Sequence, residues 1–268
     1  DAVTPPAGTP AFDAEAAAAG YTDNCGGAVT AVLTGTAVTG DNCGWTVTYT
    51  FTVTDICGNE LTDQTIMHSG SNQTAPTGTA PEGTTGIDAC YVDAVTPPDG
   101  TPAFDAEAAA AGYTDNCGGT VTAELTGTSV SGDACAWTVT YTFTVTDACG
   151  NELTDQTIVH SGSDQTAPTG TAPEGTTGIN ACYVDAVTPP AGTPAFDAEA
   201  AAAGYTDNCG GAVTATLTNT QVTGDDCSWT VTYTFTVTDA CGNELIDQTI
   251  VHSGSDQTAP TGTAPEGT

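Results

Sequence analysis

The clearest pattern in the chain is a strict alternation of apolar residues with threonine over Trp137–Asp147. Trp, Val, Tyr, Phe and Val occupy every second position, and Thr fills the positions between them. Because successive side chains of a β-strand point to opposite faces of a sheet, this period of two predicts a strand with one buried face and one threonine face. The pattern recurs over Trp45–Asp55 and Trp229–Asp239.

The segments around this strand predict a hairpin and a short helix. Ala148–Asn151 is turn chemistry, so Glu152–His160 is expected to return as the partner strand. Asp105–Gly112 offers an N-cap Asp, an acidic first turn and a terminal Gly, which predicts a short helix. Ala28–Leu33 and Ile87–Val95 are weaker strand candidates.

The whole pattern repeats along the chain, since DAVTPP begins at Asp1, Asp93 and Asp185 and the period is therefore 92 residues. The Gly-, Pro-, Ser- and Thr-rich segment Ser161–Gly178 is interpreted as a linker leading into an edge strand. We therefore expect an all-β array of immunoglobulin-like β-sandwiches that forms an elongated rod. Its complete repeats would be 71–162 and 163–254, preceded by a partial repeat at 1–70 that lacks its first strands and followed by the start of another at 255–268.

Eleven cysteines recur at the same spacing, without the CxxC pairs of zinc or redox motifs, and so predict disulfides and an oxidising, exported location. Cys135 precedes and Cys149 follows a strand that spans about 36 Å at ~3.3 Å per residue. These two cannot pair, because the Cα atoms of a disulfide lie within about 7 Å.

A sandwich with its termini at opposite poles instead predicts Cys90–Cys135 and Cys117–Cys149. The equivalent predicted pairs are Cys182–Cys227, Cys209–Cys241 and Cys25–Cys57. Cys43 is expected to be unpaired, because its partner would precede residue 1. The alternative of Cys90–Cys149 with Cys117–Cys135 remains open, because the topology is inferred.

Charge restricts the partners of the chain. Lys and Arg are absent while Asp and Glu number 33, so the net charge is −33. Nucleic acids are excluded as partners, because binding them needs cationic side chains, and the same lack of cations argues against nucleotide phosphates and anionic membrane surfaces. No run of about 18 apolar residues occurs, so we expect no membrane insertion in this segment, with any signal or anchor outside it.

Several motifs carry a family resemblance. TDNCGG, a Cys shortly before WTVTYTFTVTD, DACGNE and the DQTAPTGTAP linker recur through the chain, first at Asp23–Gly27, Trp45–Glu60 and Gln73–Pro81. They resemble the HYR-like, immunoglobulin-like repeats of giant Bacteroidetes surface adhesins, among them gliding-motility adhesins. The resemblance implies type IX secretion, a place on the bacterial cell surface and a filament presented to a substratum.

One group of residues is a candidate calcium site, and no other cofactor is expected. Carboxylate and amide oxygens are expected to gather at one pole of the sandwich, and such oxygens suit Ca²⁺. The residues are Asp115, Asn116, Asp147, Asn151 and Glu152. The alternative is that they cap turns.

Other singled-out residues favour structure over chemistry. Trp45, Trp137 and Trp229 are interpreted as core residues, with a carbohydrate platform as the alternative. His68, His160 and His252 lie one repeat apart and cannot converge on one metal. No nucleophile and base stand at a sensible spacing, so we expect no enzyme.

The sequence therefore predicts a stalk whose repeats contact their neighbours in the same chain and extend an adhesive region from the cell. Near-identical copies add length, which serves a spacer more than a catalyst. The alternatives are a repeat-borne module that binds a polysaccharide or another surface, and a homopolymeric surface fibre.

Overall fold

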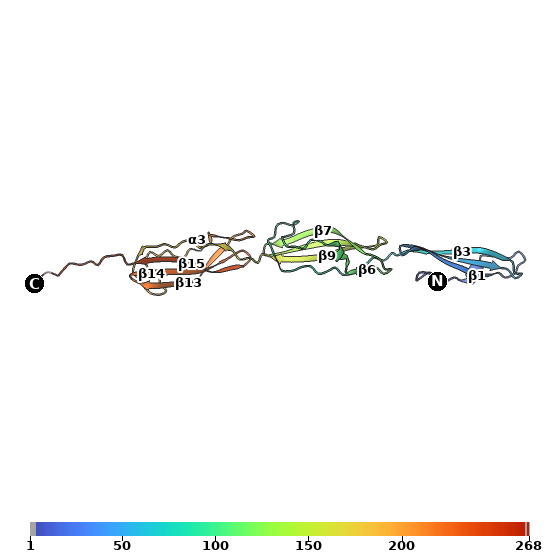
Figure 1. Ribbon diagram of the computed structural model, residues 1–268, viewed down its shortest axis with the longest axis horizontal. Coiled ribbons are helices and arrows are strands. Elements are labelled where there is room, and N and C mark those ends of the chain that lie inside the picture. The colour runs from blue at the N-terminus through green and yellow to red at the C-terminus, as the bar shows by residue number, and fades with distance from the viewer. Residues whose placement is uncertain (1–3, 266, 268) are drawn as a thin grey trace. The chain divides into compact units, whose positions relative to one another are not determined.

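The computed structural model describes residues 4–265 and 267 and shows a mostly β protein (Figure 1). Similar repeats with the period of 92 residues each contain a short helix and β-sheets, so the predicted all-β repeat array is confirmed. The first compact unit comprises the chain up to Pro81, Phe104–Thr126 and Thr142–Thr157. The second comprises Glu82–Ala103, Gly127–Tyr141 and the chain from Ile158. The domain boundaries predicted from the sequence stay a prediction.

The elements follow the same order in each repeat. The first repeat contains α1 (Ala14–Ala18), β1 (Thr30–Asp41), β2 (Gly44–Thr54) and β3 (Glu60–Gly70). The second contains β4 (Thr77–Gly78), β5 (Ile87–Asp88), α2 (Ala106–Ala110), β6 (Tyr113–Thr114), β7 (Thr122–Asp133), β8 (Ala136–Thr146) and β9 (Glu152–Ser163). The third contains β10 (Thr169–Gly170), β11 (Ile179–Asn180), α3 (Ala198–Ala202), β12 (Tyr205–Thr206), β13 (Thr214–Asp225), β14 (Ser228–Thr238) and β15 (Glu244–Ser255).

Long antiparallel strands form the main sheets, and Figure 1 shows β13, β14 and β15 side by side. The sheet orders are β1-β2-β3, β5-β9-β8-β7 and β11-β15-β14-β13, with two small sheets, β4-β6 and β10-β12. The short strands β5 and β11 run parallel to β9 and β15. The predicted strand at Trp137–Asp147 and its hairpin partner are confirmed as β8 and β9.

The apolar face of β14 forms the core of the third repeat. Val231, Tyr233, Phe235 and Val237 are buried, whereas the threonines between them are half-buried. Each such side chain contributes about 1.5–3 kcal/mol of hydrophobic stabilisation when fully buried. The ring of Phe196 lies 5.5 Å from that of Phe235, and the α3 alanines complete the cluster.

The repeat tryptophan belongs to this core. Trp137 and Trp229 are each 1% exposed, which confirms the interpretation of these two as core residues. The indole Nε1–H of Trp229 donates to the carbonyl of Ala181 at 2.8 Å, so its polar atom is satisfied inside the protein. Trp45, in the three-stranded sheet, is half-buried.

The predicted helix is confirmed as α2. The Asp105 carboxylate accepts hydrogen bonds from the N–H groups of Glu107 and Ala108, at 2.9 and 3.1 Å. These bonds satisfy donors that a helix N-terminus leaves free. The helix buries Ala109 and Ala110.

The weaker strand predictions were right in place but wrong in length. The candidate at Ala28–Leu33 becomes the long strand β1, which continues past a bulge between Leu33 and Gly35. The candidate at Ile87–Val95 yields only the two residues of β5. There the Asp93 carboxylate accepts from the N–H of Val95 at 2.8 Å and forms a turn that ends any extended pairing.

Candidate functional site

Disulfides join consecutive repeats. Within residues 4–265 and 267 the structure contains Cys43–Cys149 in the first unit, and Cys90–Cys209 and Cys135–Cys241 in the second. Their Cα–Cα distances are 4.9, 5.0 and 4.8 Å. Each bond connects a cysteine of one repeat to a cysteine of the following repeat. These bonded turns define two junctions: the first between the first and second repeats, and the second between the second and third.

The pairing predicted from the sequence is wrong. Cys90, Cys135, Cys149, Cys209 and Cys241 are all bonded, but to other partners than predicted. Cys43, expected to be unpaired, is bonded to Cys149. The predicted pairs Cys117–Cys149, Cys25–Cys57 and Cys182–Cys227 do not form, and neither does the alternative of Cys90–Cys149 with Cys117–Cys135. Cys25, Cys57, Cys117, Cys182 and Cys227 are free and exposed among the described residues.

Turn geometry explains the actual pairing. Cys43 lies in the turn between β1 and β2, where the Asp41 carboxylate accepts from its N–H at 2.9 Å. Cys149 lies in the turn between β8 and β9 of the next repeat, where Asp147 accepts from its N–H at 2.8 Å. Within one repeat these two kinds of turn lie at opposite ends of the same long strand, such as β8. A cysteine in one kind of turn can therefore bond to a cysteine in the other only across a junction. Cys135 and Cys149 flank the two ends of β8 and do not pair, as predicted, but their partners, Cys241 and Cys43, lie in other repeats.

A polar network lies beside the first of these disulfides. The Nδ2 amide of Asn72 donates to Asp115 Oδ1 at 3.0 Å and to Asp147 Oδ2 at 3.1 Å. The Asn151 amide donates to Asp147 Oδ2 at 2.8 Å and to the Asn72 carbonyl at 3.3 Å. Asn72 lies in the segment that follows β3 and therefore connects two turns of the second repeat.

The five residues predicted as a calcium site are only partly brought together. Asp115, Asp147 and Asn151 belong to the network around Asn72, whereas Asn116 and Glu152 are exposed. Burial alone would raise the pKa of Asp147, but hydrogen bonds from Asn151 and nearby backbone N–H groups hold it below its ordinary value. Calcium at these five residues stays a prediction.

Asn72, at the centre of the network, was not among the site residues predicted from the sequence. A signal was present in the sequence, since the repeat position of Asn72 carries Asp164 in the next copy. This position lies in a linker rich in Gly and Pro, and the pattern of apolar and polar residues predicts only a connection there. Nothing in the linker pattern shows that its side chain is buried, as both Asn72 and Asp164 are.

The histidines have structural roles. His160 and His252 are buried in β9 and β15, and their Nδ1 atoms accept hydrogen bonds from the N–H groups of Thr84 and Thr176, both at 2.9 Å. Burial lowers the pKa of both imidazoles. Each therefore stays neutral and holds a linker segment against its own sheet.

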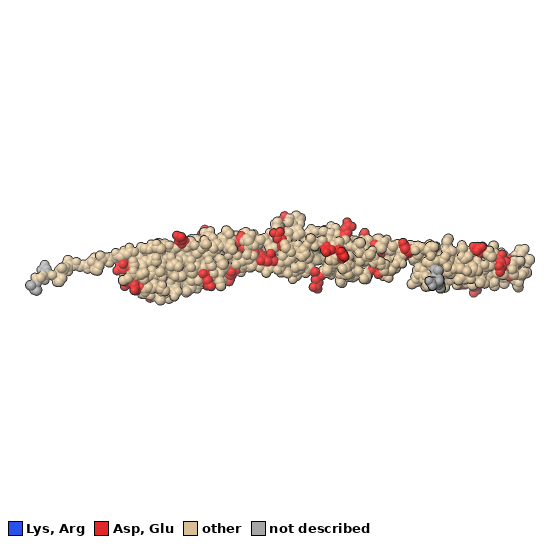
Figure 2. Space-filling view, in the orientation of Figure 1, with Lys and Arg blue, Asp and Glu red and all other residues tan. Residues whose placement is uncertain are grey.

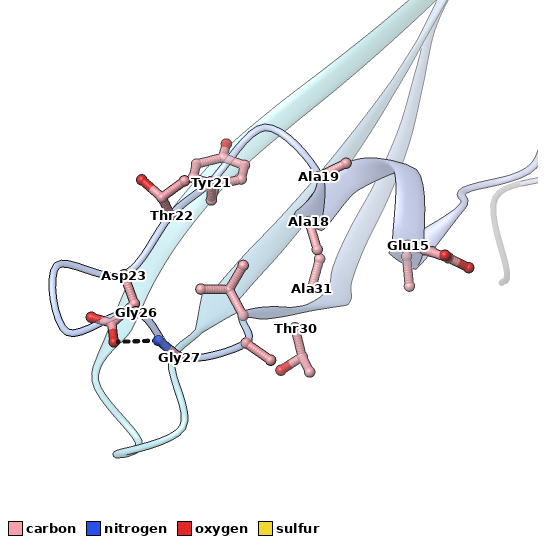
Figure 3. Close-up of a pocket in the computed structure, with 13 residues that line it drawn as sticks. Glu15, Ala18, Ala19, Tyr21, Thr22, Asp23, Gly26, Gly27, Thr30 and Ala31 are labelled. Atoms are coloured by element: carbon pink, nitrogen blue, oxygen red, sulfur yellow. Dashed lines mark hydrogen bonds between the residues drawn. The ribbon is translucent and has the colours of Figure 1, made fainter.

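A groove beside the helix recurs in each repeat. In the first repeat it lies between α1 and β1, has a volume of about 810 Å³ and is lined largely by alanines, glycines and Tyr21. Figure 3 shows Asp23 at its end, where the carboxylate accepts from the Gly27 N–H at 3.3 Å. The equivalent grooves beside α2 and α3 measure about 600 and 560 Å³.

The visible surface carries scattered acidic side chains and no basic ones (Figure 2). In the part of the chain that the structure describes, no helix is long and apolar enough to cross a membrane. No protein-family model matches the chain, and no curated protein matches it significantly. The family resemblance of the repeat motifs therefore stays a prediction.

Proposed function

We propose that the chain is a structural stalk segment of a large secreted bacterial surface adhesin, which extends an adhesive region away from the cell. The observation that carries this proposal is that disulfides tie consecutive repeats together. At the second junction two bonds, Cys90–Cys209 and Cys135–Cys241, act beside the peptide linker. Two cross-links at separate points oppose hinge motion of one repeat on the next.

The disulfide bonds and the negative charge of the chain both suit a stalk at the cell surface. Disulfides persist in oxidising, exported environments, which agrees with secretion to the cell surface. The net charge of −33 opposes collapse of neighbouring repeats and side-by-side aggregation of chains, and salt weakens this repulsion. Gliding motility, suggested by the family resemblance, would use such a stalk to carry the adhesive end.

Solution X-ray scattering of the full chain tests the proposal. A compact globule of 268 residues has a radius of gyration of about 18 Å. A stalk segment must give a much larger value that changes little with the addition of Ca²⁺-free salt up to about one molar, where charge repulsion is screened. A radius of gyration as small as that of the globule would contradict the proposed function.

The recurring groove favours a second candidate, in which each repeat binds a polysaccharide or another surface ligand. A glycan array probed with the full chain tests it. The matched variant carries Ala19→Arg, Ala111→Arg and Ala203→Arg, which place a long side chain at an exposed position of each groove. Specific glycan binding that the variant loses would support a ligand-binding function of the repeats. If no glycan binds the wild type, the polysaccharide-binding candidate is contradicted.

The exposed free cysteines favour the third candidate, a homopolymeric fibre, because thiols in the first and third repeats can form disulfides between copies. The mass of purified oxidised particles separates the two cases. A single-chain mass of 26.5 kDa contradicts the polymer, and a ladder of multiples that reductant collapses supports it.

A further inference from the structure

The two junctions differ at one central position, and the difference changes their chemistry. At the first junction, every side-chain polar atom of Asn72 has a partner. Its Nδ2 donates to Asp115 and Asp147, and its Oδ1 accepts from the Thr74 N–H at 3.0 Å. A neutral amide thus lies between two carboxylates and satisfies both as a donor.

At the second junction Asp164 takes this position, facing Asp207 and Asp239. A carboxylate cannot donate to its neighbours as the amide does. Asp164 is only 3% exposed, its Oδ1 accepts from the Thr166 N–H at 3.2 Å, and its Oδ2 is buried without a partner among the described residues. The Oδ1 of Asp207 is likewise buried and without a partner in the described part of the chain.

The second junction therefore concentrates negative charge that no Lys or Arg side chain offsets. Burial raises the pKa of Asp164, and the charges of Asp207 and Asp239 raise it further against hydrogen bonds from the Thr166 N–H and the Asn208 side chain. The chain contains no Lys or Arg that could neutralise the cluster. A buried carboxylate that keeps an oxygen without a hydrogen bond and has no cation beside it is strongly destabilising.

The geometry fits a hard cation held by oxygen atoms. One carboxylate oxygen of Asp164 and one of Asp207 lie within 4.8 Å of each other. Calcium binds oxygen at about 2.3–2.6 Å, so a single ion can contact two oxygens at this separation. Cys209 Sγ also lies within this distance, but its disulfide to Cys90 removes the thiolate that soft metals prefer.

We propose that Asp164 and Asp207, with the charge of Asp239 beside them, bind one Ca²⁺ ion at the second junction. At the first junction, where the sequence predicts calcium, the Asn72 amide takes the place of the ion between Asp115 and Asp147. The ion links the linker after β9 to the turn that contains Cys209. It therefore fastens the third repeat to the linker at a point next to the Cys90–Cys209 bond. This site does not depend on the proposed stalk function.

Calorimetric titration of the oxidised full chain with CaCl₂ tests the site, at about 150 mM salt so that diffuse binding to exposed acids is screened. We expect one ion per chain, at least tenfold weaker binding in Asp164→Asn, and a second equivalent site in Asn72→Asp. The first junction shows that Asn is accommodated at this position, so Asp164→Asn is expected to fold. Ca²⁺ should also raise the melting temperature of the wild type but not that of Asp164→Asn.

The matched control is Asp256→Asn, which removes a carboxylate at the same repeat position where the side chain is exposed. It should bind Ca²⁺ as the wild type does. An equal loss of binding in Asp256→Asn and Asp164→Asn would overturn the proposal, because binding would then follow net charge. Absence of any heat or melting shift with Ca²⁺ would also overturn it and would assign the neutralisation to a bound proton.

Discussion

Mechanical extension of the oxidised chain should stop at about a third of its contour length. The shortest covalent route between the chain ends runs from the first residue to Cys43, crosses to Cys149, returns along the chain to Cys135, crosses to Cys241 and continues to the last residue. This route contains about 83 spacings between consecutive residues and, at about 3.5 Å per spacing, extends to roughly 290 Å, against roughly 930 Å for the reduced chain.

Single-molecule pulling between the two ends measures this limit with and without reductant. In Cys135→Ser with Cys241→Ser, the shortest route runs to Cys90, crosses to Cys209 and continues to the last residue, so the limit rises to about 520 Å. The matched control, Cys117→Ser, removes a free thiol and should keep the limit of the oxidised wild type.

The refuting results are distinct. Pairing within each repeat, as the sequence suggested, leaves a route of about 145 residues and a limit of about 510 Å in the oxidised wild type. An oxidised chain that reaches about 930 Å would show that none of the cross-links forms. Either value would refute disulfide linkage between repeats.

Three further predictions follow from particular residues. Gly162→Ala should lower the free energy of unfolding by about 1–3 kcal/mol, measured by thermal denaturation, because the added Cβ would overlap the Trp137 ring and the Ile87 carbonyl. In the control Gly44→Ala the Cβ would enter open space, so the loss should be smaller. Burial depresses the pKa of His160 and His252, so the stability that these histidines contribute is full above about pH 6.5 and is lost as the pH falls further. The melting temperature should therefore be lower at about pH 5.5 than at about pH 7.5. The difference should be smaller in the variant in which both histidines are Gln. In a chain extended before Asp1 by Cys-Tyr-Val, the residues that precede Asp93 and Asp185, the added cysteine should bond to Cys117, as Cys90 bonds to the equivalent Cys209. Peptide mass mapping after oxidation with oxidised glutathione detects this disulfide. An extension by Ser-Tyr-Val should leave Cys117 free.

Local patterns predicted the local structure well. The alternation of apolar residues with Thr specified β8, and Asp105 with the following alanines specified α2, because strand and helix periods are properties of neighbouring residues. The period of 92 residues likewise predicted the repeats. These features need no knowledge of how one repeat meets another.

The junction chemistry could not be obtained in the same way. Cys90 lies much closer along the chain to Cys135 than to its partner Cys209, at a sequence separation of 119, and spacing alone gives no reason to prefer the more distant cysteine. The importance of Asp164 also depends on tertiary contacts, because its burial and the nearby charges of Asp207 and Asp239 come from residues far away in the sequence. In a chain of near-identical copies, equivalent cysteines make pairing within and between copies look alike.

The forward pairing of cysteines has a consequence for how such genes change length. Cys43 and Cys135 occupy the same repeat position and bond to equivalent partners, each at a sequence separation of 106. Unequal recombination that deletes or inserts one whole period therefore keeps the same spacing between the cysteines that bond across each remaining junction. The gene can therefore gain or lose whole repeats while each junction that remains keeps cysteines at the spacing its disulfide needs.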